Sequence, residues 1–356
     1  MTIESAPAEG TKTPVNVLTG FLGSGKTTLL QRMLRSPSMS RTAVLINEFG
    51  EIGLDHLLIE RADESVVLLQ SGCVCCSIRD DLKSALRGLL GRRDRGEIPA
   101  FDRVVLETTG IADPTPILYT LIGDAVLRHH FQFANVITTV DAVNAMLHLS
   151  ENPEGAKQLA AADWVVITKT DLTQASDVAS VRATVGRFNP SAAVVEAATG
   201  NIDPDRLLAP RTLELSSYGT GTRSAVTNIA GVDTVDQGMF TLRWQSSPHS
   251  DIASMSLALE HPLDWTAFGI WLSMLLNRHG QNVLRVKGIL QVEGLSSPVF
   301  FNAVQHVVHP PQHLDRWPTA DHRSRIVFIT RGLDHALLKR SLAAFCRNRI
   351  SHLTDE

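Results

Sequence analysis

Residues 20–28 read Gly20-Phe-Leu-Gly23-Ser24-Gly25-Lys26-Thr27-Thr28, and this stretch decides the fold of the chain. It matches the pattern G-x-x-x-x-G-K-[ST] and lies between a predicted strand at residues 15–19 and a predicted helix at residues 27–34. The glycines let the backbone turn so that its N–H groups face the phosphates of a nucleotide. Lys26 is expected to neutralise phosphate oxygens, and the Thr27 hydroxyl is expected to coordinate Mg²⁺. The stretch therefore predicts a phosphate-binding loop rather than a Gly-rich turn that matches by accident.

Short apolar runs alternate with helical patterns between residues 14 and 210. We predict strands at residues 15–19, 42–46, 66–69, 103–106, 136–140, 164–168 and 193–195. A helix is predicted at residues 78–90, where aliphatic side chains recur on one face. Near-continuous apolar strands separated by helices are typical of a parallel sheet that is covered on both faces. Residues 14–210 are therefore expected to form an α/β domain of the P-loop NTPase type, with a doubly wound, mainly parallel sheet.

The composition changes after Pro210. Residues 211–236 are rich in Ser, Gly and Thr and are predicted to be an interdomain linker. In residues 237–350 we predict strands at 239–245, 283–292, 299–307 and 326–330, and helices at 263–278 and 334–347. This pattern indicates a smaller α+β domain with a mainly antiparallel sheet. Residues 1–13 are expected to be a disordered leader.

The overall composition excludes several classes of protein. The 356 residues contain 33 Lys and Arg against 37 Asp and Glu, a formal net charge of −4, so the chain lacks the basic surplus expected of a nucleic-acid-binding protein. No apolar run approaches the ~20 residues of a membrane span, and the N-terminus lacks the pattern of a signal peptide. We therefore expect a cytoplasmic protein that binds neither nucleic acid nor membrane.

A second motif, Thr168-Lys169-Thr170-Asp171, follows the apolar run at residues 164–167 and concerns the base of the nucleotide. A carboxylate at Asp171 can accept hydrogen bonds from N1–H and N2–H of guanine, a pair of donors that adenine does not present. The aliphatic stem of Lys169 can lie over the base. Alone, so short a pattern could be a helix N-cap, but it stands at a strand end, where ligands bind in doubly wound sheets. The motif therefore favours GTP over ATP.

Between these two motifs, the stretch Leu106-Glu107-Thr-Thr-Gly110 supplies candidates for the metal and the γ-phosphate. A carboxylate at the end of an apolar strand commonly joins the Mg²⁺ shell, directly or through water. Gly110 could offer its N–H to the γ-phosphate, and residues 111–114 would then move when this phosphate leaves. No Gln follows the turn to orient water, so we expect slow intrinsic hydrolysis, with Glu107 or a partner positioning the water. The catalytic candidates are Lys26, Thr27 and Glu107, and the nucleotide-binding candidates are Gly20, Gly23, Ser24, Gly25, Lys26, Thr27, Thr28, Gly110, Thr168, Lys169 and Asp171.

Three of the four cysteines fall within four residues, in the stretch Gly72-Cys73-Val74-Cys75-Cys76. A disulfide scaffold would spread its cysteines along the chain, so a metal or thiolate role fits better. In an extended chain Cys73 and Cys75 project to one face, and a following helix N-terminus favours the anionic, metal-binding form. Two or three thiolates are fewer than the four ligands of a closed structural zinc site, which suits an ion that is handed on. A redox cysteine pair and buried structural cysteines remain alternatives.

The histidines are interpreted as ordinary surface residues. His306, His309 and His313 have helical spacing, but Pro310 and Pro311 exclude a helix there. We therefore expect them to be exposed loop histidines rather than metal ligands.

Taken together, the ordered motifs resemble the CobW-type GTPases, a family of cytoplasmic metallochaperones. The resemblance rests on the phosphate loop, on residues 47–55 (Asn-Glu-Phe-Gly-Glu-Ile-Gly-Leu-Asp), on the CxCC stretch, on residues 107–114 (Glu-Thr-Thr-Gly-Ile-Ala-Asp-Pro) and on residues 168–171. It covers residues 14–350, since residues 285–289 and 325–329 are similar to strands of the CobW C-terminal domain.

The resemblance implies a specific set of roles. Lys26 and Thr27 would hold the triphosphate and Mg²⁺, Glu107 would replace an Asp that is common in other GTPases, and Asp171 would select guanine. The transferable metal would be held by Cys73, Cys75 and Cys76. Binding of GTP would order residues 47–55 and 110–114 around the cysteines, and hydrolysis to GDP would release the metal to a client metalloprotein. A GTP-dependent homodimer is also implied by relatives.

The identity of the metal is left open by the sequence. Zn²⁺ is the commonest assignment for the family, but residues 211–236 contain no His, unlike the His-rich tract of many zinc-handling relatives. Co²⁺, for a cobalamin pathway or a nitrile hydratase, is the alternative. A GTPase with redox-sensing thiols and a scaffold GTPase are the hypotheses from other classes.

Overall fold

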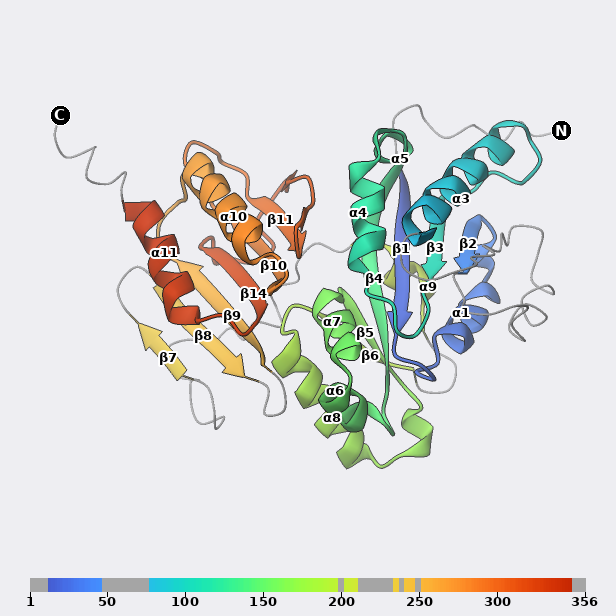
Figure 1. Ribbon diagram of the computed structural model, residues 1–356, viewed down its shortest axis with the longest axis horizontal. Coiled ribbons are helices and arrows are strands. Elements are labelled where there is room, and N and C mark those ends of the chain that lie inside the picture. Colours follow the sequence, from blue (N-terminus) through green and yellow to red (C-terminus); the bar gives the residue numbers. More distant parts are fainter. Residues whose placement is uncertain are drawn as a thin grey trace.

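The structure is a computed structural model that describes residues 12–46, 77–197, 202–210, 233–236, 240–246 and 251–347. Within these ranges the chain forms two domains, each built on its own sheet (Figure 1). The strand predicted at residues 66–69, the cysteine stretch, residues 47–55 and most of the expected linker lie outside the described residues.

The first domain contains a six-stranded sheet in the order β2-β3-β1-β4-β5-β6, with every neighbouring pair parallel. Its strands are β1 (Thr13–Gly20), β2 (Thr42–Ile46), β3 (Arg103–Glu107), β4 (Phe131–Asp141), β5 (Trp164–Thr168) and β6 (Ala193–Glu196). The strand order reverses around β1, so the loop after β1 opens at the point where doubly wound sheets bind ligands. The predicted fold class is confirmed.

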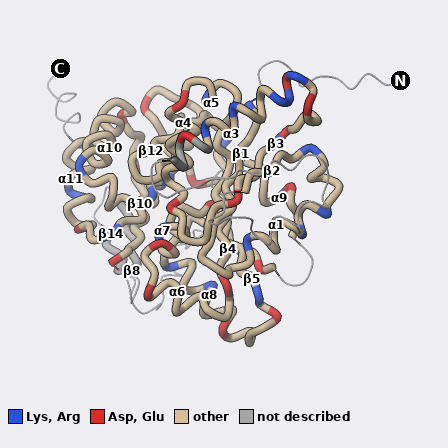
Figure 2. Tube along the Cα trace, turned by 45° about the vertical axis from the view of Figure 1, so that its right-hand side comes forward, with Lys and Arg blue, Asp and Glu red and all other residues tan. Residues whose placement is uncertain are grey.

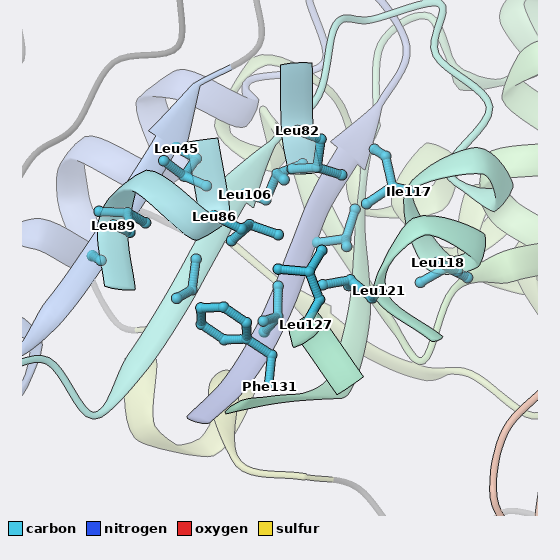
Figure 3. Packing of buried hydrophobic residues seen from close by; sticks show 14 of the residues in the cluster. Leu45, Leu82, Leu86, Leu89, Leu106, Ile117, Leu118, Leu121, Leu127 and Phe131 are labelled. Carbon is cyan, nitrogen blue, oxygen red and sulfur yellow. The ribbon is translucent and has the colours of Figure 1, made fainter. Parts of the chain in front are cut away.

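Helices cover both faces of this sheet (Figure 1). They are α1 (Lys26–Leu34), α3 (Ser77–Asp94), α4 (Thr115–Gly123), α5 (Ala125–His130), α6 (Ala145–Glu151), α7 (Pro153–Ala161), α8 (Ala175–Phe188) and α9 (Pro204–Leu208), with short 3₁₀ turns at Pro37–Met39 and Thr170–Leu172. Figure 3 shows the core between the sheet and helices α3, α4 and α5, where Leu82, Leu86 and Leu89 of α3 face Leu106 and Phe131. The leucines of the aliphatic row predicted for this helix are therefore buried.

The second domain contains an antiparallel sheet in the order β12-β11-β10-β14-β9-β8-β7, with β13 paired to β11. Helices α10 (Trp265–His279) and α11 (His335–Arg347) share a core with one face of it. The strands are β7 (Asp233–Asp236), β8 (Phe240–Ser246), β9 (Ile252–Leu259), β10 (Val283–Leu290), β11 (Val299–Val304), β12 (Val307–Val308), β13 (Gln312–His313) and β14 (Ser324–Arg331).

Three details of the second domain differ from the sequence prediction. The last four residues of the expected linker form β7 and pair with β8. Strand β9 was not predicted because its Ala and Ser residues give a weak apolar pattern, although it pairs with β14 along its whole length. The single strand predicted at residues 299–307 is a hairpin of β11 and β12, because the chain turns at Gln305 with φ 49°.

A buried ion cluster joins the two domains. Arg285 and Lys287 of β10 point away from α10 and α11 and reach Asp163, which lies just before β5, at N···O distances of 2.6 and 2.9 Å. All three side chains are at most 3% exposed, and the other Asp163 oxygen accepts the N–H of Val136 at 3.0 Å. Burial acts to raise the pKa of Asp163, but the charges of Arg285 and Lys287, together with hydrogen bonds from Val136 and Lys287, outweigh it and lower the pKa to about 2. Elsewhere, Lys and Arg are interspersed with Asp and Glu along both domains (Figure 2).

His309 belongs to this interface, which corrects the expectation that it is an exposed loop residue. Its ring packs against Phe133 of β4 with a centroid distance of 4.8 Å, and only 9% of the residue is exposed. The pKa of His309 is lowered to about 4, first because burial penalises the imidazolium and second because Arg285 repels it. Pro310 and Pro311 exclude a helix but do not predict whether His309 is buried. Its burial depends on residues of the first domain, such as Phe133.

We expect acid to weaken the folded state through His309. Its pKa falls from 6.5 to about 4 on folding, so between these values the unfolded chain binds a proton that the folded chain does not. The free energy of unfolding should therefore fall by roughly 3 kcal/mol as the pH drops from 7 to 4. Urea unfolding at several pH values, compared between the wild type and His309→Gln, measures this contribution as the difference between the two curves. His313→Gln, at an exposed position, is the control, and identical pH dependence in all three proteins would contradict the expectation.

Candidate functional site

The phosphate loop connects the end of β1 to the start of α1. Gly20, Gly23 and Gly25 all have positive φ, and Gly25 precedes the helix in the left-handed conformation. A Cβ on Gly20 would lie 2.3 Å from Thr139 Oγ1 and 2.5 Å from Thr139 O, so only glycine fits there. Helix α1 has no side-chain cap and no acidic residue in its first turn. The positive end of the dipole of this described helix therefore favours an anion at the loop.

Lys26 lies inside the curve of the loop. Its Nζ donates to the carbonyl oxygens of Gly20 at 2.9 Å and Phe21 at 3.2 Å, and the residue is only 9% exposed. A buried ammonium held by the loop backbone places a positive charge where the phosphates of a nucleotide would enter.

Thr27 and Glu107 meet beside the loop. The Thr27 hydroxyl donates to Glu107 Oε1 at 2.6 Å, and Glu107 is a 4% exposed residue at the end of β3, the neighbour of β1. A hydroxyl and a carboxylate oxygen are hard ligands of the kind that Mg²⁺ prefers. The structure thus brings together the two residues that were predicted as magnesium candidates, and their chemistry fits this ion.

The end of β5 is tied to the phosphate loop. Thr168 Oγ1 donates to the carbonyl of Ser24 at 2.7 Å, and the Ser24 hydroxyl lies 2.6 Å from Thr139 Oγ1. The sequence indicated Thr168 only as part of a base-recognition motif. In the structure it also anchors the loop that is expected to bind the phosphates.

Lys169 is held by Asp141, a residue that the sequence analysis missed. Lys169 has φ 56°, and its Nζ lies 2.7 Å from Asp141 Oδ2, a carboxylate whose side chain is 2% exposed. Burial acts to raise the pKa of Asp141, but hydrogen bonds from Lys169, Asn144 and the Val143 N–H lower it below its usual value. An acid directly after the apolar run at residues 136–140 was the available signal.

An open pocket of about 1010 Å³ lies beside these residues. It is lined by Thr28 and Arg32 of α1, by Lys169 and Asp171 after β5, and by the segment at residues 202–204. Asp171 is exposed in the Thr170–Leu172 turn. The pocket is large enough for a nucleoside and opens next to the phosphate loop.

Gly110 lies against the same loop. A Cβ on Gly110 would be 2.6 Å from the backbone nitrogen of Leu22, so any larger residue would displace one of the two segments. The stretch before it is fixed to β1, since Thr108 N–H donates to Leu18 O and the Thr108 hydroxyl donates to Thr19 Oγ1, both at 2.9 Å.

The metal candidates Cys73, Cys75 and Cys76 lie outside the described residues. Across the part of the chain that the structure describes, no group of three or more His, Cys, Asp and Glu side chains could hold a metal ion. No helix among the described residues has the length and apolar character needed to cross a membrane.

The fold and the phosphate loop define a P-loop nucleotide-binding protein. Residues 14–196 match the family model of the CobW/HypB/UreG nucleotide-binding domain, and residues 252–346 match the C-terminal domain of the cobalamin synthesis protein cobW. The chain therefore belongs to the CobW/HypB/UreG family.

Named relatives span most of the chain. The zinc chaperone YjiA of Escherichia coli (strain K12) is 33% identical over 316 residues, which cover 88% of this chain and 93% of that protein. The zinc-regulated GTPase metalloprotein activator 1 of Schizosaccharomyces pombe is 35% identical over 213 residues, 58% of this chain and 50% of that protein. The crystal structure of Zn(II)-bound YjiA GTPase from E. coli has a TM-score of 0.66 at 27% identity and covers 94% of this chain and 99% of that one.

Proposed function

We propose that this protein is a metallochaperone that binds zinc through its CxCC stretch and transfers it to client metalloproteins, under the control of GTP binding and hydrolysis. The chain is a GTPase by its P-loop fold and its family, and its relatives include the YjiA GTPase and a zinc-regulated GTPase metalloprotein activator. The observation that carries the nucleotide-dependent part of the proposal is the Thr27–Glu107 pair, with its 2.6 Å hydrogen bond, beside a phosphate loop at the reversal point of the sheet.

Different residues of the site would contact the phosphates and the Mg²⁺ ion. Lys26 would move its ammonium from the Gly20 and Phe21 carbonyls to the β- and γ-phosphate oxygens, and the N–H groups of the loop would point at the same oxygens. Thr27 and Glu107 would hold Mg²⁺, Glu107 directly or through water. When bound, this ion would neutralise developing negative charge on the phosphates. Gly110 would present its N–H to the γ-phosphate.

The base would lie in the open pocket beside β5. Asp171 would accept the N1–H and N2–H donors of guanine, and the stem of Lys169 would lie along the ring. The ion pair of Lys169 with Asp141 supports this arrangement, because it restricts where that stem can lie.

The cargo would be held by Cys73, Cys75 and Cys76, which directly precede α3 in the sequence. Thiolates are soft ligands that suit Zn²⁺ and also Co²⁺, and the relatives named zinc chaperones favour zinc. Cobalt delivery, to a cobalamin pathway or a nitrile hydratase, is the alternative. A cytoplasmic location and a GTP-dependent homodimer remain predictions.

An anaerobic titration tests the cargo and its control by the nucleotide. Co²⁺ is added to the full-length protein with Mg²⁺–GTP or Mg²⁺–GDP, ultraviolet-visible absorption is recorded, and Zn²⁺ is then titrated back. We expect intense thiolate-to-metal bands for about one Co²⁺ per chain with GTP, and weak bands with GDP. Zn²⁺ should displace the cobalt.

Cysteine variants test whether the absorption bands arise from the CxCC stretch. Cys75→Ser should lose the bands, whereas Cys346→Ser, in α11, should keep them. Absence of the bands in both nucleotide states would contradict the metallochaperone proposal and leave a GTPase with redox-sensing thiols as the better account.

A further inference from the structure

We propose that Gln158 and Gln305 are positioning residues for the γ-phosphate turn at residues 110–113, and that through Gln305 the C-terminal domain takes part in distinguishing GTP from GDP. This inference rests on the proposed function, since it takes Gly110 as the residue that contacts the γ-phosphate. It adds a role for the second domain within the nucleotide site.

Gln158 holds the turn from the side of α7. Its Nε2 donates to the carbonyl oxygens of Gly110 at 3.2 Å and Ala112 at 2.9 Å, and the residue is fully buried. Its own backbone carbonyl accepts the Thr138 hydroxyl of β4 at 3.0 Å. One side-chain amide therefore connects the turn to the sheet, through the carbonyl oxygens of Gly110 and Ala112.

Gln305 holds the turn from the side of the second domain. Its Nε2 donates to Asp113 Oδ2 at 3.3 Å, across 192 residues of sequence, while Asp113 Oδ1 accepts the N–H of Thr115 at the start of α4. Asp113 thus connects the turn, the next helix and the other domain. Its carboxylate also lies 3.9 Å from Lys157 Nζ of α7.

The backbone of Gln305 supports a dedicated role for its side chain. It has φ 49°, and among the described residues only Lys169 shares a positive φ without being glycine. A left-handed residue at the turn of a β-hairpin is commonly Gly, which has no Cβ to clash, or Asn or Asp, whose short polar side chains can hydrogen-bond locally. Asn tolerates this backbone better than Gln but is one methylene too short to span the same gap to Asp113.

The two domains also pack against each other close to Gln158 and Gln305. Helix α7 contacts β10, as Figure 1 also shows, and Arg285 of β10 donates to the carbonyl of Ala161 at the end of α7. Val304 and Val307, which flank Gln305, pack into the same core as Ile117 and Leu118 of α4. A shift of residues 110–113 on loss of the γ-phosphate would therefore act on both α7 and the β11–β12 hairpin.

The experiment compares the affinities of full-length protein for two fluorescent nucleotides, GDP and a non-hydrolysable GTP analogue with a β,γ-imido bridge. Each is measured with Mg²⁺ in the wild type, Gln158→Met and Gln305→Asn. Loss of one or two hydrogen bonds to the turn should weaken the analogue about 10-fold and leave GDP within about 2-fold. Single-turnover hydrolysis of GTP should slow in both variants.

Two further variants distinguish a loss of γ-phosphate positioning from a general loss of stability. Gln312→Asn, an exposed exchange of the same kind on β13, should change neither affinity. Gln305→Gly relieves the backbone strain, so its thermal midpoint should equal or exceed that of the wild type while its preference for the analogue still falls. A merely structural role would not produce this combination.

The outcomes are distinguishable. If Gln158→Met and Gln305→Asn lose affinity for both nucleotides equally, or keep the wild-type preference, the positioning role is wrong while the GTPase assignment stands. If the wild type itself binds neither nucleotide, or does not hydrolyse GTP, the proposed function fails, and this inference fails with it.

Discussion

Asp163→Asn should lose about 3–5 kcal/mol of the free energy of unfolding, the range expected when one partner of a buried ion pair is removed. Asp163 is the carboxylate that both Arg285 and Lys287 contact, and all three side chains are at most 3% exposed. The substitution would leave two buried positive charges facing a neutral amide. Because the contact joins the two domains, the loss should also loosen their interface.

Urea unfolding followed by tryptophan fluorescence measures this loss. Asp102→Asn is the matched control, since Asp102 pairs with Arg41 at 2.6 Å but is 50% exposed, and exposed pairs contribute little. The pKa of Asp163 is lowered on folding to about 2, so its contribution should persist above pH 4 and disappear only as the pH falls toward 2. A loss below about 1 kcal/mol at pH 7 would mean that the cluster tolerates its unpaired cations.

Lys26→Met should reduce GTP hydrolysis by on the order of 100-fold or more, the scale on which a single preorganised charge or donor acts in a transition state. Met fills a similar volume, but it has no donor for the Gly20 and Phe21 carbonyls and no charge for the phosphates. Affinity for GTP should fall as well, because the ammonium is proposed to contact both the β- and γ-phosphates in the ground state.

Phosphate release under saturating GTP, together with a nucleotide-binding titration, checks this expectation. Lys12→Met removes an exposed lysine just before β1 and should leave both quantities unchanged. Wild-type hydrolysis by Lys26→Met would show that the loop does not bind the triphosphate in the proposed way.

Local features of the first domain could be predicted from the sequence. The apolar runs at residues 42–46 and 164–168 are observed as β2 and β5 with the same boundaries, because strands buried on both faces need apolar residues throughout. The phosphate loop was recognisable because its glycines, Lys26 and Thr27 must follow one another at fixed spacing. The second domain was predicted less completely, since β9 and the β11–β12 turn depend on pairing with strands distant in the sequence.

The contacts that connect the site to the rest of the molecule could not be predicted in this way. The only sequence signal for Asp141 is its place directly after an apolar run, and Gln158 and Gln305 are ordinary polar residues in the sequence with no motif around them. Each acquires its role through a partner 28 or more residues away, namely Lys169, Gly110 and Asp113. His309 was misjudged for the same reason, since its burial is caused by the other domain.

By itself, the sequence determined the class of fold, the position of the phosphate loop and the residue types that can bind a nucleotide and a soft metal. These properties depend on the order of residues along a short stretch of backbone, where spacing dictates geometry. Only the tertiary structure decided that a buried Asp163 holds Arg285 and Lys287 and that the second domain reaches Asp113 in the turn at residues 110–113. The free energy of such contacts depends on burial and on which distant groups meet, and neither is encoded in local spacing.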